Sequence, residues 1–418
     1  MKGWEKMGIV VQKFGGTSVG SIERIKNVAN RVINTVNNGD QVVVVVSAMG
    51  KSTDELVSLA KGISQKPSKR EMDMLLTTGE QVTISLLAMA LQEKGYDAVS
   101  LTGWQAGIIT EPCHSDARIN NFNETRISSH LAAGKIVIVA GFQGVTDDGE
   151  ITTLGRGGSD TTAVALAAGL KADRCDIFTD VTGVFTTDPR VVKGARKLSS
   201  ISYDEMLELA NLGAGVLHPR AVEFAKNYHV KLSVRSSMVE EEGTIIEEEV
   251  SMEENLVVRG LAFESNVTKI SVCSMPNNLS GLSNLFTTLA ANNINVDIII
   301  QNVSESENTN ISFSIHSEKL AETLEVLEAN RKQLQFEEVR YESGLAKVSI
   351  VGSGMISNPG VAGQMFKVLS DNGIFIKMVS TSEIKVSTVL DQSDMVKAVE
   401  VLHEAFDLAN VKIPQINA

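Results

Sequence analysis

Cysteine is scarce in this chain of 418 residues, and the three cysteines, Cys113, Cys175 and Cys273, lie far apart. They form no CxxC pair and no zinc-binding spacing, which indicates reduced thiols in a cytoplasmic protein. Long apolar runs are also missing, since runs such as Val42–Val46 are far shorter than a membrane span. The N-terminus has no apolar stretch that ends in a cleavage site, so we expect no secretion signal.

Proline and positive charge are low as well. Only 7 prolines accompany 33 glycines, which argues against collagen-like or low-complexity tracts. The chain carries 38 Lys and Arg against 51 Asp and Glu, a net charge of −13. A field of that sign repels nucleic acid and anionic membranes, so we expect neither as a main partner. The length suggests two or three domains, with cores large enough to need no disulfide or structural metal.

Short β-branched runs alternate with helical patterns over the first 235 residues. The runs are continuously apolar, as is typical of strands buried on both faces of a parallel sheet. The expected strands are Ile9–Phe14, Gln41–Ser47, Asp97–Leu101, Lys135–Ala140, Cys175–Thr179 and Val230–Val234. The expected helices lie near 21–37, 52–64, 70–94, 123–134, 160–171 and 203–227. The alternation predicts an α/β fold, a three-layer αβα sandwich.

The chain changes character after an acidic connector at residues 239–256. The segment Lys269-Ile-Ser-Val matches Lys347-Val-Ser-Ile, and later stretches match at a similar offset, which indicates two copies of a small α+β module of βαββαβ type. Each copy is expected to hold a late helix, Glu318–Asn330 or Gln392–Phe406. We expect domains at 1–250, 265–340 and 341–410, with a strand from 255–264 completing the last. Paired modules of this kind suggest ligand sensing.

The strongest local signal is the string KFGGTSVG, residues 13–20. It leaves a buried strand, turns through Gly15 and Gly16 and enters a helix, so backbone N–H groups and the helix N-terminus can hold an anion. Lys13 can add a full charge where a transferring phosphoryl group needs one. The structural alternative is an ordinary strand–turn–helix in which Ser18 or Ser21 caps the helix.

Three further segments carry candidate polar groups. GRGGSD at 155–160 is a second glycine loop that opens a helix, and Arg156 suits a carboxylate or phosphate, although Asp160 would also cap the helix. The string FTDVTGVFTTDPR at 178–190 follows a strand, where polar groups line a ligand crevice or form a surface turn. Glu80 can accept an ammonium group or decorate a first helical turn. The six histidines show no paired-ligand spacing, so we expect no structural metal.

These strings together resemble the aspartokinase family. The resemblance rests on KFGGTSVG (13–20), VVVVVSAMGKSTDEL (42–56), TTGEQ (77–81), GRGGSDTTA (155–163), FTDVTGVFTTDPR (178–190) and LGAGVLHPRAVEFA (212–225), in that order. It implies the amino-acid kinase sandwich followed by two ACT regulatory modules. It also implies phosphorylation of the side-chain carboxylate of L-aspartate by MgATP, with Mg²⁺ carried by the nucleotide, at the first step of lysine, threonine, methionine and diaminopimelate synthesis.

The resemblance also implies roles for single residues. Lys13 and Asp160 match the catalytic positions. The substrate-binding positions are Ser47, Thr53, Glu80 (α-ammonium), Arg156 (α-carboxylate), Gly157, Gly158 and Ser159. The ATP-binding positions are Lys13, Phe14, Gly15, Gly16, Ser18, Thr179, Asp180, Phe185, Asp188, Arg190 and Lys231. Since a carboxylate is already nucleophilic at neutral pH, the chemistry needs positioning and charge neutralisation rather than a base.

Regulation is the other implied property. ACT modules pair across chains, so a homo-oligomer that binds lysine, threonine or both is expected. Asp297 would take the effector's ammonium, and Gln301 and Asn302 its carboxylate, unless this stretch is only the solvent-facing end of a strand. The turn at 274–281 departs from the family by lacking Pro-Gly, whereas Asn358-Pro-Gly360 keeps it. Another amino-acid kinase, or an inactive amino-acid-binding regulator, are the competing interpretations; intact Lys13, Arg156 and Asp160 argue against the second.

Overall fold

The computed structural model describes residues 8–212, 216–248, 257–303 and 308–410. The chain divides into two compact units. The first comprises residues 1–184, 197–211 and 215–254, and the second comprises residues 185–196, 212–214 and 255–418. Along the chain, the change from the first unit to the second falls after residue 254, except for short segments of which 185–196 is the longest.

An eight-stranded sheet forms the centre of the first unit, in the order β10-β12-β11-β9-β1-β2-β6-β3. Its strands are β1 (Ile9–Phe14), β2 (Gln41–Val46), β3 (Ala98–Leu101), β6 (Ile136–Ala140), β9 (Arg174–Thr179), β10 (Ser200–Ser202), β11 (Leu232–Ser236) and β12 (Thr244–Glu247). All neighbours are parallel except β11 and β12. The six strands expected from the sequence are all present within two residues at each end.

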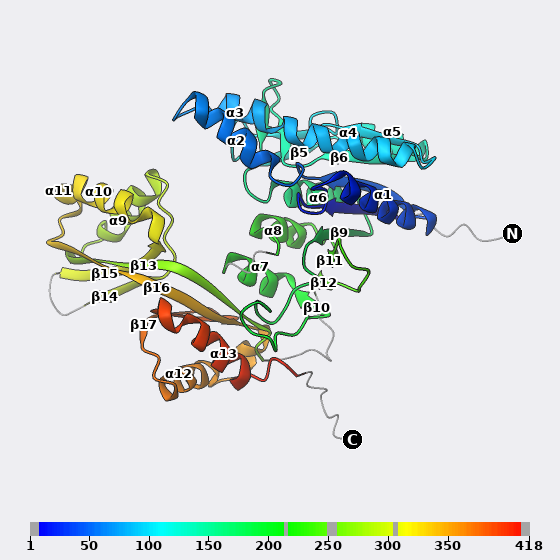
Figure 1. The fold of residues 1–418 in the computed structure, drawn as a ribbon. Coiled ribbons are helices and arrows are strands. Elements are labelled where there is room, and N and C mark those ends of the chain that lie inside the picture. The colour runs from blue at the N-terminus through cyan, green and yellow to red at the C-terminus, as the bar shows by residue number, and fades with distance from the viewer. Residues whose placement is uncertain (1–7, 213–215, 249–256, 304–307, 411–418) are drawn as a thin grey trace, which may run out of the picture. The chain divides into compact units, whose positions relative to one another are not determined.

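Helices cover both faces of this sheet, as the sandwich fold requires (Figure 1). The side chain of Phe14 packs with α1 (Ile22–Asn37) and α4 (Thr78–Gln92) on one face. The next residue inward along β1, Lys13, points to the opposite face and reaches α6 (Gly158–Gly169), which α8 (Pro219–Asn227) contacts. This alternation follows from the pleat of the strand.

The first unit contains further helices and a second sheet. They are α2 (Ser52–Ile63), α3 (Lys69–Leu76), α5 (Thr125–Ala132), α7 (Tyr203–Asn211) and a four-stranded sheet in the order β5-β4-β7-β8. Its strands are β4 (Ile108–Thr110), β5 (Ile119–Phe122), β7 (Gln143–Val145) and β8 (Ile151–Thr153). The helix expected over 70–94 is divided at Thr77. The stretch of residues 69–92 is long and apolar enough to cross a membrane, but its α4 part buries Ile84, Leu87 and Leu91 against the sheet.

The second unit contains a six-stranded antiparallel sheet in the order β14-β15-β13-β16-β18-β17. The strands are β13 (Gly260–Pro276), β14 (Ile299–Val303), β15 (Asn308–His316), β16 (Glu338–Val351), β17 (Ile376–Thr381) and β18 (Lys385–Asp391). The α-helices are α9 (Gly281–Ala291), α10 (Leu320–Ala329), α11 (Arg331–Leu334), α12 (Val361–Asp371) and α13 (Met395–Ala405), with 3₁₀ turns at Ser317–Lys319, Ser353–Ser357 and Gln392–Asp394.

The two copies of the repeat share the long strands β13 and β16. Residues 260–264 of β13 pair with residues 347–351 of β16, and residues 270–273 pair with residues 338–341. Two apolar clusters follow the same division: α9 and α10 pack over one half of the sheet and α12 and α13 over the other. Each long strand therefore serves one module with its first half and the other module with its second half.

The segment 185–196 belongs to the second unit although its sequence neighbours belong to the first. Thr186 is fully buried; its hydroxyl lies 3.0 Å from Nε2 of His403 on α13, and its carbonyl accepts from the N–H of Leu261 at 2.7 Å. Val192 packs in the apolar cluster of α12 and α13. The folding of this segment therefore depends on the rest of the second unit.

Candidate active site

An ion pair between Lys13 and Asp160 marks the carboxyl edge of the first unit's sheet. Lys13 Nζ lies 2.6 Å from Asp160 Oδ1, and both side chains are about nine-tenths buried. Lys13 is near the end of β1, and Asp160 is in the first turn of α6. Gly15 follows closely: a Cβ built there would lie 3.5 Å from Lys13 Nζ. A paired, nearly dry ammonium beside a glycine turn is suited to neutralising an incoming phosphoryl group.

The loop before α6 needs glycine for steric reasons. Gly155 and Gly157 have φ values of +74° and +68°, in the left-handed region. A Cβ on Gly157 would lie 2.2 Å from the side chain of His218, so no other residue fits without displacing that ring. Arg156, between the two glycines, is exposed. The loop therefore presents the exposed guanidinium of Arg156 on a backbone whose position is fixed by the close contact between Gly157 and His218.

Ser47 and Ser159 join the same edge. Their hydroxyl oxygens lie 3.0 Å apart, Ser47 at the end of β2 and Ser159 next to Asp160. Gly16 packs against the following loop, because a Cβ there would lie 2.9 Å from the carbonyl oxygen of Ala48. Three motifs distant in the sequence are thus brought together: two follow the neighbouring parallel strands β1 and β2, and the third opens α6.

Glu80 is the buried carboxylate of this region. It lies in the first turn of α4 and is 3% exposed; Oε1 accepts from the N–H of Ala48 at 3.1 Å, while Oε2 is buried without a hydrogen-bond partner among the described residues. Burial raises the pKa of Glu80 to about 7, against the opposing effect of the backbone hydrogen bonds. An orphaned carboxylate oxygen fits an absent cation such as a substrate ammonium. Thr53, on α2, is half-buried.

The expected nucleotide-side residues are only partly brought together. The hydroxyl of Ser18 donates to that of Ser237 at 2.8 Å, and Ser237 Oγ is also within 3.1 Å of the carbonyl oxygen of Thr179, which precedes Asp180. Phe14 is fully buried and its ring stacks on Phe178, with centroids 4.6 Å apart, so that ring is part of the core.

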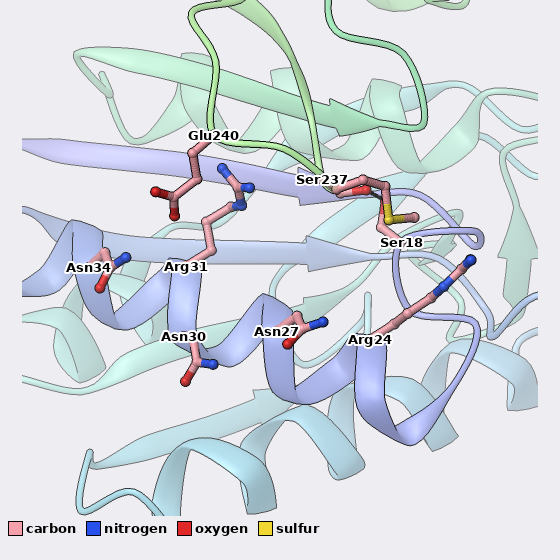
Figure 2. Close-up of a pocket in the computed structure, with 9 residues that line it drawn as sticks. Ser18, Arg24, Asn27, Asn30, Arg31, Asn34, Ser237 and Glu240 are labelled. Atoms are coloured by element: carbon pink, nitrogen blue, oxygen red, sulfur yellow. Dashed lines mark hydrogen bonds between the residues drawn. The ribbon is translucent and has the colours of Figure 1, made fainter.

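A polar groove opens beside Ser18, along α1 (Figure 2). Arg24 lies near the Ser18 and Ser237 end, and Arg31 lies beside Glu240. Arg24 Nη1 donates to the carbonyl of Thr17 at 2.5 Å, and the guanidinium of Arg31 sits 5.1 Å above the ring centre of Phe178. Partial burial lowers the pKa of Arg31. Sequence reasoning missed this groove, although the spacing of Arg24, Asn27, Arg31 and Asn34 along one helix face was a usable signal.

Other expected site residues lie elsewhere. Lys231 immediately precedes β11, beside Arg174, and is therefore at the amino end of the parallel strands, whereas Thr179 is at the carboxyl end. The structure does not bring Lys231 to the Lys13 edge. Phe185, Asp188 and Arg190 belong to segment 185–196 of the second unit. Arg190 forms a two-pronged ion pair with Asp188 and thereby lowers the pKa of that carboxyl.

The expected effector residues lie in the second unit. Asp297 forms an ion pair with Lys347 of β16, whose ammonium lies 2.8 Å from Glu264 as well. Gln301 and Asn302 are exposed on the edge strand β14. Desolvation opposes the charge on Lys347, but its two carboxylate partners raise its pKa overall. Part of the motif LGAGVLHPRA (residues 213–215) lies outside the described residues.

Comparison with known proteins defines the class of protein first. Residues 8–236 match the amino acid kinase family, and residues 270–330 and 348–406 each match an ACT domain. An aspartokinase of Bacillus sp. (strain MGA3) is 72% identical over 403 residues, covering 96% of this chain and 98% of the relative. The chain belongs to the aspartokinase family.

Two solved structures are similar over nearly the whole chain. The E. coli aspartokinase III complex with aspartate and ADP, in the R-state, is 28% identical, with a TM-score of 0.80 over 95% of this chain and 99% of that one. The same enzyme with lysine and aspartate, in the T-state, gives a TM-score of 0.73 at 28% identity and the same coverage. The amino-acid kinase sandwich and the paired ACT modules expected from the sequence are confirmed.

Proposed function

We propose that the chain transfers the γ-phosphoryl group of ATP to the side-chain carboxylate of L-aspartate, giving 4-phospho-L-aspartate. The observation that carries this proposal is the Lys13–Asp160 pair at 2.6 Å, set between two glycine loops at the carboxyl edge of the sheet. Membership of the aspartokinases supports the choice of substrate. The three free cysteines agree with work in the cytoplasm at an early step of amino-acid synthesis.

The residues at this edge divide the work between the two ends of aspartate. Glu80, with its orphaned Oε2, receives the α-ammonium, and Arg156 pairs with the α-carboxylate through its planar fork. The space between Glu80 and Arg156 is lined by Ser47, Ser159, Gly157 and Gly158, and Thr53 lies beside this space. The side-chain carboxylate of aspartate then faces Lys13. The ammonium of Lys13, held in place by Asp160, stabilises the negative charge of the phosphoryl group during its transfer.

The polar groove beside Ser18 is our candidate for the phosphate-bearing side of ATP. Arg24 and Arg31 supply positive charge, and the Ser18, Ser237 and Thr179 contacts connect the groove to the Lys13 loop. The described residues contain no group of three or more His, Cys, Asp or Glu side chains that could hold a metal ion. We assign Mg²⁺ to the nucleotide phosphates, because Mg²⁺ sheds water reluctantly and is usually bound through substrate phosphates; there it would neutralise charge as the phosphoryl group moves.

A hydroxamate assay tests this function, because an acyl phosphate reacts with hydroxylamine. The parent should give product only with both L-aspartate and MgATP. The Arg156→Lys variant keeps the charge but loses the two-pronged geometry, so KM for aspartate should rise at least about tenfold while KM for ATP stays within twofold. The Lys171→Arg variant, a conservative change on the exposed surface, is the control. An equal rise in both KM values would contradict the role of Arg156.

We also propose that lysine, threonine or both inhibit the enzyme through the ACT modules, in a homo-oligomer. The lysine complex of E. coli aspartokinase III supports a search for such an effector. Gln301 and Asn302 are exposed on an edge strand and can donate to a carboxylate. The carboxylate of Asp297 is already paired with Lys347, so it would have to accept from the effector's ammonium and from Lys347 together. The effector must bind two states of the protein unequally to act at a distance.

The regulatory proposal predicts separable effects. The Gln301→Ala variant should keep its uninhibited kcat and KM and require at least several-fold more lysine or threonine for half inhibition. Titration of both amino acids, singly and together, gives the midpoints, and sedimentation of the parent gives the oligomeric state. A midpoint unchanged from the parent with every inhibiting effector would remove Gln301 from the site.

A further inference from the structure

Asp73 is a fully buried carboxylate that no proposed role has used so far. It lies on α3, is 0% exposed, and accepts hydrogen bonds from three residues. Thr153 Oγ1 lies 2.6 Å from Oδ1, the N–H of Ser115 lies 3.1 and 3.0 Å from the two oxygens, and His114 Nδ1 lies 2.9 Å from Oδ2. Since burying a carboxylate is costly unless it is well paired, these bonds fix three segments tightly together.

The bonds to Thr153 and Ser115 lead to the loop that carries Arg156. Thr153 ends β8, three residues before Arg156, and its carbonyl also accepts from the N–H of Ala117 at 2.9 Å. Ser115 belongs to the loop that supports Gly155: a Cβ on Gly155 would lie 3.2 Å from the carbonyl oxygen of Ser115. The position of the Arg156 loop therefore depends on the hydrogen bonds that Thr153 and Ser115 make to the carboxylate of Asp73.

The other side of Asp73 leads to Glu80. The backbone carbonyl of Asp73 accepts from the N–H of Thr77 at 3.2 Å, and Thr77 is the residue that divides α3 from α4. The carbonyl of Thr77 accepts from Gln143 Nε2 at 3.1 Å, which fixes the junction to β7. Glu80 follows within the first turn of α4. Asp73 thus joins the Arg156 loop to the start of α4, which carry the groups that we assign to the α-carboxylate and the α-ammonium of aspartate.

We propose that Asp73 is a positioning residue that sets the separation between Glu80 and Arg156, and so makes the site selective for an α-amino acid. The inference rests on the proposed function. An α-ammonium and α-carboxylate are attached to one carbon, so both partners must be held within a fraction of an ångström for both contacts to form. A ligand with only the carboxylate places no such demand on the spacing.

The test compares Thr153→Val with Thr153→Ser. Valine matches threonine in shape but cannot donate to Asp73, whereas serine keeps the hydroxyl. We expect the valine variant to raise KM for L-aspartate at least about fivefold, with kcat and KM for ATP within twofold, and the serine variant to resemble the parent. Asp73→Asn should act in the same direction, and more strongly, if it folds; thermal melting of each variant checks folding.

Succinate gives a second readout that a purely structural role would not move. It lacks the ammonium, so it can follow a displaced Arg156, and its inhibition constant against aspartate should change less than twofold in Thr153→Val. Equal weakening of aspartate, succinate and ATP, or a fall in kcat alone, overturns the positioning role. If the parent is active and KM for aspartate is the same in Thr153→Val as in the parent, the positioning role is also overturned. A parent with no aspartate-dependent activity overturns the proposed function and this inference with it.

Discussion

The carboxyl group of Glu80 carries a consequence for stability. Its pKa rises from an ordinary value of 4.5 to about 7 because burial disfavours the charged form. A raised carboxyl pKa means that the folded state holds the proton more tightly, so its stabilising effect is complete below pH 4.5 and is lost as pH rises through 7. The ligand-free parent should lose up to about 3 kcal/mol of unfolding free energy over this window relative to Glu80→Gln.

Denaturant unfolding of the parent and Glu80→Gln at pH 5.5 and 8 measures this difference. Saturating aspartate should reduce the loss in the parent, because an ammonium beside Glu80 favours the ionised form. For the same reason, KM for aspartate in the parent should rise as pH falls below about 7, and this dependence should be weaker in Glu80→Gln. Parallel stability profiles for the two proteins would mean that Glu80 is ionised without cost.

Lys13 makes the second residue-scale prediction. Lys13→Ala removes a charge that acts on the transferring phosphoryl group, so kcat should fall at least about a hundredfold, which is roughly 2.7 kcal/mol of barrier. The variant also leaves Asp160 buried without its partner, so a thermal melt must accompany the kinetics. A variant that folds, binds both substrates and retains a kcat near that of the parent would contradict the proposed role.

At the same scale, the motifs predicted Lys13, Ser159 and Asp160 as candidates because each ends a buried strand or opens a helix, and the family resemblance added Ser47. Lys231 failed to join them because strand direction places it at the opposite edge of the sheet. Asp73 was missed because its partner Thr153 is 80 residues away in the sequence. Side-chain contacts of that separation cannot be predicted from local pattern.

At the scale of elements, Gly157 tests how the Arg156 loop is built. Gly157→Ala would place a Cβ 2.2 Å from His218, whereas Gly149→Ala meets nothing within 4 Å; both positions have positive φ. Both variants share a backbone cost of about 1 kcal/mol, so their difference isolates the clash. We expect Gly157→Ala alone to raise KM for aspartate severalfold or abolish activity. Kinetics and thermal melts that match between the two variants would argue against a steric role.

Prediction of elements succeeded where apolar runs were long. The strands β1, β2, β6 and β9 each contain five or six residues and were expected almost to the residue. The strands β4, β7 and β8 have only three residues each, and their sheet is defined by pairing with remote segments. The helix expected over 70–94 extended through Thr77, although the stretch Thr77-Thr-Gly-Glu80 is polar. Local propensity therefore describes the central sandwich and misses the small sheet that supports the Arg156 loop.

For the whole molecule, the segment 185–196 predicts what truncation would do. A chain ending at residue 250 lacks His403, Leu261 and the apolar cluster around Val192. The segment should then lose its fixed structure and become cleavable by trypsin at Arg196, which is half-buried in the full chain and whose N–H donates to Thr186 Oγ1 at 3.0 Å. The full chain should be cleaved there more slowly. Mass spectrometry of timed digests measures this, with the exposed Lys171 as the internal standard. Equal cleavage rates in both chains would show that the segment folds without its neighbours.

The same segment limits how such enzymes can be recombined. Grafting the regulatory half of one relative onto the kinase half of another looks simple, because the acidic stretch near residue 250 offers an obvious junction. Yet twelve residues from the middle of the kinase sequence complete the core of the regulatory half. A chimera joined only at that junction would pair a foreign segment 185–196 with α13 and β13. A chimera that keeps both activity and inhibition should therefore need two additional crossover points, one at each end of segment 185–196, so that this segment comes from the same relative as the regulatory half.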